Sequence, residues 1–227
     1  MAIIKKTSKL PLSQNEAAEG HVDSCACFTD HSCQDERTKD RDYASLIQQL
    51  EHEDPLVRRW GARDLAEYPQ AAAALTSRLL GEVELSVREV ILSSLAAIGD
   101  ETAVRGLVDC LRSEDALLRN EAIEIMKLLP DQVAPIMLTL LVDADTDVRI
   151  FAVNILESLR HPAVENWLIE VIQHDENVNV CATALDLLAE VGSKASEQPL
   201  TQIQARFPGE PYIRFAAEMA LKRLAEN

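Results

Sequence analysis

Five side chains that bind metals in proteins lie within thirteen residues near the N-terminus: His21, Cys25, Cys27, His31 and Cys33. Thiolates and imidazoles are the preferred ligands of zinc, copper(I) and iron–sulfur clusters. The two cysteines of the C-x-C step cannot form a relaxed disulfide with each other, but both thiolates can face one metal. The spacing is neither that of a zinc finger nor that of a ferredoxin. The sequence therefore predicts a metal or cluster site here, with a metal-free cysteine-rich arm as the alternative.

Other residues give no catalytic arrangement. The sequence holds no recognisable Ser/His/Asp order, glycine-rich phosphate loop or H-E-x-x-H helix. Cys110 and Cys181 are interpreted as small buried apolar residues, the usual environment of a free cysteine. His52, His161 and His174 fall at expected helix ends, where an imidazole is favourable near the C-terminal dipole. We predict no catalytic residue.

The rest of the chain repeats one pattern. Around Val148, an acid stands three residues before, an arginine one residue after, a small residue at plus four, and apolar residues at plus five, eight and eleven. This spacing is typical of one apolar stripe on a helix that begins with an acidic N-cap. The same frame recurs at intervals of 30, 31, 30, 32 and 33 residues, at Val57, Val87, Leu118, Val148, Val180 and Ile213.

A period this steady predicts an all-α fold, an α-solenoid of about six two-helix repeats over residues 42–227. Residues 1–41 lack a helical period and are predicted to be a mostly irregular arm. Gly99 and Gly192 are expected to end two helices in the left-handed conformation, and Pro130 and Pro135 to begin or bend the first helix of repeat four. Each repeat is expected to have two helices. The six expected pairs are 42–51 with a helix that begins at 54, 70–80 with 84–98, 102–111 with 115–129, 131–141 with 145–159, 162–172 with 177–191, and 199–206 with 210–225.

An arginine follows the anchor residue in five of the six repeats: Arg58, Arg88, Arg119, Arg149 and Arg214. This ladder would be a basic strip for an acidic partner if the guanidinium groups were free. Because acids recur four residues upstream of the arginines, we favour pairing of each arginine with an acid of the same or the adjacent repeat. A second candidate surface is the cluster of Arg59, Trp60 and Arg63, in which the indole could anchor a partner or pack within the array.

Composition limits the partners. The formal net charge is −16, which disfavours binding to a phosphate backbone, so no nucleic acid is expected. No apolar run is long enough for a membrane span or a signal peptide, so we expect a cytoplasmic protein without a membrane partner. With 47% apolar and only 4% aromatic residues, the core should consist of Leu, Val, Ile and Ala.

The motif D-x-x-V-R followed by a small residue, with repeat endings such as Ser94-Leu-Ala-Ala-Ile-Gly-Asp100, resembles the HEAT-like repeat of the phycobilisome-lyase type over roughly residues 43–225. This resemblance implies an adaptor or chaperone-like binding surface. The arm is also similar in layout to the leucine-rich-variant repeat proteins, in which a small cysteine cluster holds a 4Fe-4S centre. The repeat here is longer and the arm has three cysteines, so a fourth ligand would come from His21, His31, Cys110, Cys181 or an external group.

Three functions follow as hypotheses. The first is a non-catalytic scaffold whose second helices bind a Lys- or Arg-rich protein, with a 4Fe-4S cluster or zinc in the arm that locks or senses the interaction. The alternative is a bilin-lyase-like subunit that holds a tetrapyrrole, which requires acids for pyrrole nitrogens and basic groups for propionates. The third is a metallochaperone or redox relay in metalloenzyme assembly that docks through the solenoid.

Overall fold

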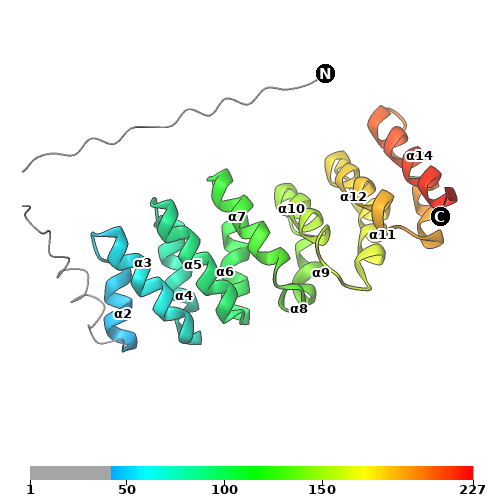
Figure 1. Ribbon diagram of the computed structural model, residues 1–227. Helices are drawn as coiled ribbons and strands as arrows, with labels where there is room; N and C mark the ends of the chain where they lie inside the picture. The colour runs from blue at the N-terminus through cyan, green and yellow to red at the C-terminus, as the bar shows by residue number, and fades with distance from the viewer. Residues whose placement is uncertain (1–41, 227) are drawn as a thin grey trace, which may run out of the picture. The chain divides into compact units, whose positions relative to one another are not determined.

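The computed structural model describes residues 42–226, which form helices joined by turns and contain no strand. Six helix pairs follow one another in chain order (Figure 1). The predicted all-α repeat array is confirmed. Residues 1–41, the predicted arm, lie outside the described residues, so the boundary at residue 41 stays a prediction.

The helices form two layers. The first helices of the pairs are α2 (Tyr43–Leu50), α4 (Ala72–Gly81), α6 (Glu101–Leu111), α8 and α9 (Pro130–Val133 and Met137–Leu140), α11 (Val164–His174) and α13 (Glu197–Arg206). The second helices are α3 (Pro55–Asp64), α5 (Leu85–Ile98), α7 (Ala116–Lys127), α10 (Thr146–Leu156), α12 (Val178–Val191) and α14 (Pro211–Glu226). Each second helix packs against the second helix of the next pair, and these helices lie side by side in one row in Figure 1. Short 3₁₀ segments complete the connections at Leu65–Glu67, Pro69–Ala71, Ala134–Ile136 and Lys194–Ser196.

The predicted helix starts depend on short acidic or amide side chains. The carboxylates of Asp54, Asp115 and Asp145 accept backbone N–H groups of the first turn, and the Asn177 side chain does the same for α12. Glu84 occupies the equivalent place before α5 but makes no such bond. Its side chain is one methylene longer than aspartate, and glutamate is not among the preferred N-cap residues.

Only one of the two predicted glycine terminators is left-handed. Gly99 has a φ of 57° and donates its N–H to the carbonyl of Leu95, as a left-handed helix end requires. Gly192 has a φ of −66° and a ψ of 151°. The prediction for Gly192 was therefore wrong, because the chain leaves α12 in an extended conformation and turns into the 3₁₀ segment at Lys194–Ser196 instead.

The core consists of aliphatic side chains from both layers, including Leu75, Leu95, Leu107 and Leu188, all 0% exposed. The described part of the chain contains no helix with the length and apolarity that a bilayer span would need. Close helix packing is visible at Gly106 of α6, where an added Cβ would lie 2.0 Å from the Thr76 hydroxyl of α4.

Repeat four differs from the others in its first helix. In place of one helix over 131–141, the chain forms α8, a 3₁₀ turn and the four-residue helix α9. Pro135 lies at this interruption because it has no N–H to donate to the preceding turn. The first layer is consequently thin at this point, and this position becomes important for the pocket described below.

Candidate binding surfaces

The arginine ladder ties each second helix to the turn that precedes it. Arg88 Nε donates to the carbonyl of Glu82 at 2.6 Å, Arg119 Nη1 to that of Ser113 at 2.7 Å, and Arg149 Nη1 to that of Asp143 at 2.8 Å. Each carbonyl lies six residues upstream of its arginine. Arg58 and Arg214 make the equivalent bonds to His52 and Pro208, at 2.8 and 3.4 Å. The ladder therefore fixes the same inter-helix turn in five repeats.

Three of these arginines also reach the next repeat. Arg58 forms a two-pronged ion pair with Glu82, Arg88 pairs with Asp115 at 2.6 Å, and Arg149 holds both oxygens of Asp175 at 2.7 and 3.2 Å. For Arg58 and Arg149, the acid four residues upstream is not the side-chain partner, since Asp54 and Asp145 cap their own helices instead. Glu84, four residues before Arg88, makes no capping bond. These guanidinium groups are thus occupied, and they present no free basic strip along residues 42–226.

Repeat five lacks the ladder arginine, and a neighbour takes its place. Cys181 occupies the position, and its thiol lies 3.3 Å from the carbonyl of Asp175. Arg206, at the end of α13, donates to the same carbonyl at 2.7 Å and also to the carbonyl of Ile172. The stabilising cation at this turn therefore comes from repeat six.

Among the acids that pair with the ladder arginines, Glu82 accepts the most hydrogen bonds, and it is only 1% exposed. Its carboxylate accepts hydrogen bonds from Arg58, from Arg78 at 2.9 Å, and from the backbone N–H groups of Val83 and Glu84 at 3.1 and 3.0 Å. Burial alone would raise the pKa of this carboxyl, but the hydrogen bonds from Arg58, Glu84 and Arg78 outweigh it and lower the pKa from 4.5 to about 2. Sequence reasoning missed this residue, because the repeat pattern points to Glu84.

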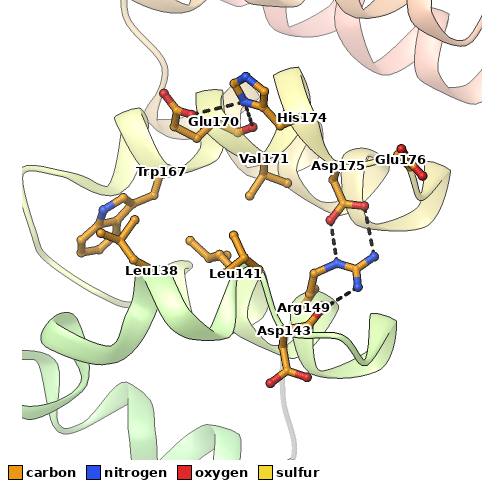
Figure 2. Close-up of a pocket in the computed structure, with 11 residues that line it drawn as sticks. Leu138, Leu141, Asp143, Arg149, Trp167, Glu170, Val171, His174, Asp175 and Glu176 are labelled. Atoms are coloured by element: carbon orange, nitrogen blue, oxygen red, sulfur yellow. Dashed lines mark hydrogen bonds and ion pairs between the residues drawn. The ribbon is translucent and has the colours of Figure 1, made fainter.

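A pocket of about 530 Å³ opens between α9 and α11, in the first layer (Figure 2). Its apolar surface is formed by Leu138, Leu141, Val142, Trp167 and Val171. Figure 2 shows Leu138 beside the Trp167 ring, and Leu141 and Val171 on facing elements. The indole of Trp167 is 9% exposed and stacks on the ring of His161 with centroids 4.9 Å apart. The pocket lies beside α9, a single turn that follows the 3₁₀ segment at Ala134–Ile136.

Charged and titratable groups also line this pocket: Asp143, Arg149, Glu170, His174, Asp175 and Glu176. Arg149 is fully engaged by Asp175 and by the carbonyl of Asp143, as the dashed lines in Figure 2 show. Asp143 pairs in turn with Arg112 at 2.6 Å. The carboxylates of Glu170 and Glu176 remain exposed to solvent, so the rim of the pocket is acidic.

The second helices carry a separate acidic surface, formed by Glu124, Glu157, Asp186 and Glu190, all exposed. Lys127 lies 3.0 Å from Glu124 and 3.2 Å from Glu157, which shows that these acids of adjacent repeats are neighbours. A shallow groove of about 230 Å³ between α10 and α12 is lined in part by Glu157, Asp186 and Glu190. Lys127 serves two of the acids, and Arg223 lines a neighbouring pocket with Glu190, so the acids of this surface still outnumber the basic groups.

The predicted partner-binding cluster lies on α3. Arg59 is exposed, Trp60 is half-buried, and the guanidinium of Arg63 stands 4.4 Å over the Trp60 ring while it also pairs with Asp64 at 2.9 Å. The structure brings the three residues together on one helix. Their role in partner binding stays a prediction.

The predicted metal ligands His21, Cys25, Cys27, His31 and Cys33 lie outside the described residues. Within residues 42–226, no group of three or more His, Cys, Asp or Glu side chains is arranged to hold a metal. Cys110 and Cys181 are both 0% exposed, and burial raises the pKa of their thiols to about 12 and about 11. Either could become a fourth ligand only after its repeat had opened.

Residues 43–127 and 134–222 match the sequence pattern of HEAT repeats. The chain belongs to the HEAT-repeat family. It is also similar to the bilin biosynthesis protein PecE of Mastigocladus laminosus, with 31% identity over 137 residues, which cover 59% of this chain and 51% of that protein. The PecE protein of Nostoc sp. is 40% identical over 75 residues, which are 32% of this chain and 30% of that protein. The chain thus spans about half the length of the first relative or less, and its resemblance to HEAT-like repeats of the phycobilisome-lyase type is confirmed.

Solved structures with a similar arrangement of helices include an archaeal HEAT-like repeat protein from Thermococcus onnurineus, with a TM-score of 0.44, 18% identity, and coverage of 80% of this chain and 86% of that one. The complex of CpcE and CpcF of phycocyanin lyase from Nostoc sp. PCC7120 gives a TM-score of 0.33 and 16% identity, over 79% of this chain and 93% of that one.

Proposed function

We propose that this HEAT-repeat protein is a scaffold that binds a Lys- or Arg-rich protein through the acidic surface of its second helices. The observation that carries the proposal is the continuity of exposed acids over three consecutive repeats: Glu124 on α7, Glu157 directly after α10, and Asp186 and Glu190 on α12. A partner with basic residues at a matching spacing could contact several of these acids at once. Complementary charge of this kind speeds association and selects the partner.

The groove between α10 and α12 adds shape to this charge. Val153 and Leu187 form its apolar part, with Thr183 and Asn154 as neutral polar groups beside the acids. A basic side chain could lie along the groove with its methylenes beside Leu187 and its charge near Glu157 or Asp186. Tyr212 extends the surface, since its hydroxyl donates to the Asp186 carboxylate at 2.8 Å.

The test is affinity capture from extracts of the source cells with the wild type and with the triple variant Glu157→Lys, Asp186→Lys and Glu190→Lys. We expect the wild type to retain a basic protein at low salt and the variant to lose it. The matched control is the triple reversal Asp109→Lys, Asp131→Lys and Glu197→Lys, which changes the net charge equally at exposed positions of the first layer. Equal retention by both triple variants would show that this surface is not the contact.

The second candidate function is a bilin-lyase-like subunit that binds a tetrapyrrole, and the similarity to two PecE proteins favours it. Acids for pyrrole nitrogens are present on both candidate surfaces. Basic groups for propionates are less available, because Arg149 is already paired at the pocket. Titration with a bilin should produce a saturable shift of its absorption band if this function is correct, and an unchanged spectrum would refute it.

For the arm, we propose from the sequence alone a metal or 4Fe-4S site at Cys25, Cys27 and Cys33 with His21 or His31. Metal and acid-labile sulfide analysis of protein purified without oxygen tests this proposal. Metal in the wild type that is absent from the triple Cys-to-Ser variant would support it. Equal metal content in the two proteins would refute it.

A further inference from the structure

The pocket between α9 and α11 exposes apolar surface that repeat three covers or replaces with charge at the equivalent positions. Val142 is 79% exposed and Leu138 is 59% exposed, although both side chains are large and aliphatic. Repeats three and four are offset by 30 residues, so Val108 of α6 is the counterpart of Leu138, and Val108 is half-buried against the core. A pocket of about 530 Å³ lies within the range of protein binding sites for a few side chains or a small ligand.

The junction between repeats three and four has a charged residue in the place of Val142. Its counterpart in repeat three is Arg112, which reaches across to repeat four and pairs with Asp143 at 2.6 and 3.2 Å. The counterpart of Asp143 in repeat five is Asp175, but valine cannot pair with it. Asp175 is instead held by Arg149. The sequence thus replaces a bridging cation with a bare apolar side chain at the edge of the pocket.

The charges at the rim restrict the ligand. All the donors that Arg149 directs toward the pocket are used, Nε and Nη2 by Asp175 and Nη1 by the carbonyl of Asp143. No lysine and no second arginine is among the residues that line the pocket in the described part of the chain. The carboxylates of Glu170 and Glu176 face solvent, and Glu170 contacts only His174, which carries charge only when protonated. An anionic group would therefore meet repulsion from these exposed carboxylates, whereas a cation would meet the carboxylates of Glu170, 3.2 Å from His174, and Glu176.

We infer that this pocket binds a segment of a partner protein in which one or two large apolar side chains stand next to Lys or Arg. The apolar side chains contact Leu138, Val142 and Trp167, and the basic residues pair with Glu170 and Glu176. This site belongs to the first layer and shares no residue with the acidic surface of the second helices, so it goes beyond the proposed function and provides a second attachment point.

The first step of the test is selection of a random dodecapeptide phage library on the full chain, with counter-selection on the variant Val142→Arg. This variant copies the arginine of the preceding junction, fills the mouth of the pocket, and is placed at a side chain exposed enough to leave the fold unchanged. The matched control is Val83→Arg, since Val83 is an 84% exposed valine in the turn before α5. We expect the selected peptides to combine apolar and basic residues, and acidic selected peptides would overturn the inference.

The second step measures affinity for the most enriched peptide by Trp167 fluorescence in a Trp60→Phe background. We expect Val142→Arg to weaken binding at least about tenfold, because it blocks the apolar contact and repels the basic residues. The pair Glu170→Gln and Glu176→Gln should weaken it about fivefold at low salt and less at high salt. Val83→Arg should leave the affinity within about twofold of the wild type, and so should the triple variant Glu157→Lys, Asp186→Lys and Glu190→Lys.

Two results would overturn the inference. One is a selection that yields no peptide able to distinguish the wild type from Val142→Arg. The other is binding of a bilin or of anionic lipid vesicles, detected by Trp167 fluorescence, that Val142→Arg strengthens. That result would make the pocket an anion site.

Discussion

Glu82 offers the sharpest test of how the repeats are held together, through the substitution Glu82→Gln. The amide keeps the size of the side chain but removes the charge, and it leaves Arg58, which is 7% exposed, without its counter-ion. The fall of the Glu82 pKa from 4.5 to about 2 corresponds to about 3 kcal/mol in favour of the ionised carboxyl in the folded protein. Removal of one partner of a buried ion pair costs a similar amount, about 3–5 kcal/mol. We therefore expect the free energy of unfolding at pH 7 to fall by about 3 kcal/mol.

The pH dependence gives this prediction a second readout. Because the pKa of Glu82 is lower in the folded state than in the unfolded chain, the unfolded chain takes up the proton first as the pH falls. The stabilisation that the ionised Glu82 carboxylate gives the folded protein is complete above pH 4.5 and is lost as the pH falls from 4.5 toward about 2. At pH 3 about 2 kcal/mol of it is gone. The gap in unfolding free energy between wild type and Glu82→Gln should thus narrow from about 3 to about 1 kcal/mol between pH 7 and pH 3.

The assay is urea denaturation followed by far-UV circular dichroism at a series of pH values. Since repeat arrays can depart from two-state unfolding, transition midpoints and slopes are compared as well as extrapolated free energies. Glu114→Gln is the control, an exposed acid outside the cluster around Glu82 that should change stability by less than about 0.5 kcal/mol at any pH. A gap for Glu82→Gln that stays constant down to pH 3, or that is below about 1 kcal/mol at pH 7, would refute the reasoning.

Three further predictions concern packing and reactivity. Gly106→Ala should destabilise the fold by about 1–3 kcal/mol, because its Cβ would clash with Thr76, and Thr76→Ala in the same chain should recover part of the loss in a urea denaturation. Cys110 and Cys181 should resist iodoacetamide at pH 8 until urea unfolds the chain, as peptide mass spectrometry would show, because burial raises their thiol pKa values to about 12 and about 11. Arg206→Met should lower the free energy of unfolding by about 1–3 kcal/mol, since two carbonyls of repeat five lose their donor; no change would mean that water replaces the guanidinium.

The sequence predicts the repeat architecture well because the relevant signals are local. An anchor, a small residue and an apolar stripe define each second helix, and short N-cap side chains define where it begins. The partners of the arginines are not local. Arg58 finds Glu82 in the next repeat rather than the acid four residues upstream. Glu82 directly follows α4, which ends at Gly81, so its inward orientation depends on the path of a turn that the repeat pattern does not describe.

The pocket is less predictable for a related reason. Leu138 and Val142 have the residue types of a core, so residue type alone does not indicate that they are exposed. Leu138 lies on α9 and Val142 just beyond its end, so their exposure depends on where the first helix of the next repeat is placed. An apolar pattern predicts which face of a helix packs against a neighbour. Whether a neighbouring helix reaches that face depends on the position of the adjacent repeat.

An open pocket between two repeats is compatible with a stable array only if the same junction is held elsewhere. At the junction of repeats four and five, the second layer supplies this support. Helices α10 and α12 pack against each other, and Arg149 donates two hydrogen bonds to the Asp175 carboxylate. Arg206 of repeat six donates a further hydrogen bond to the backbone carbonyl of Asp175. Because the ion pairs are concentrated in these turns, the first layer can leave Val142 and Leu138 uncovered without separating the repeats, and the array can present a ligand-sized opening at the position where its periodicity is broken.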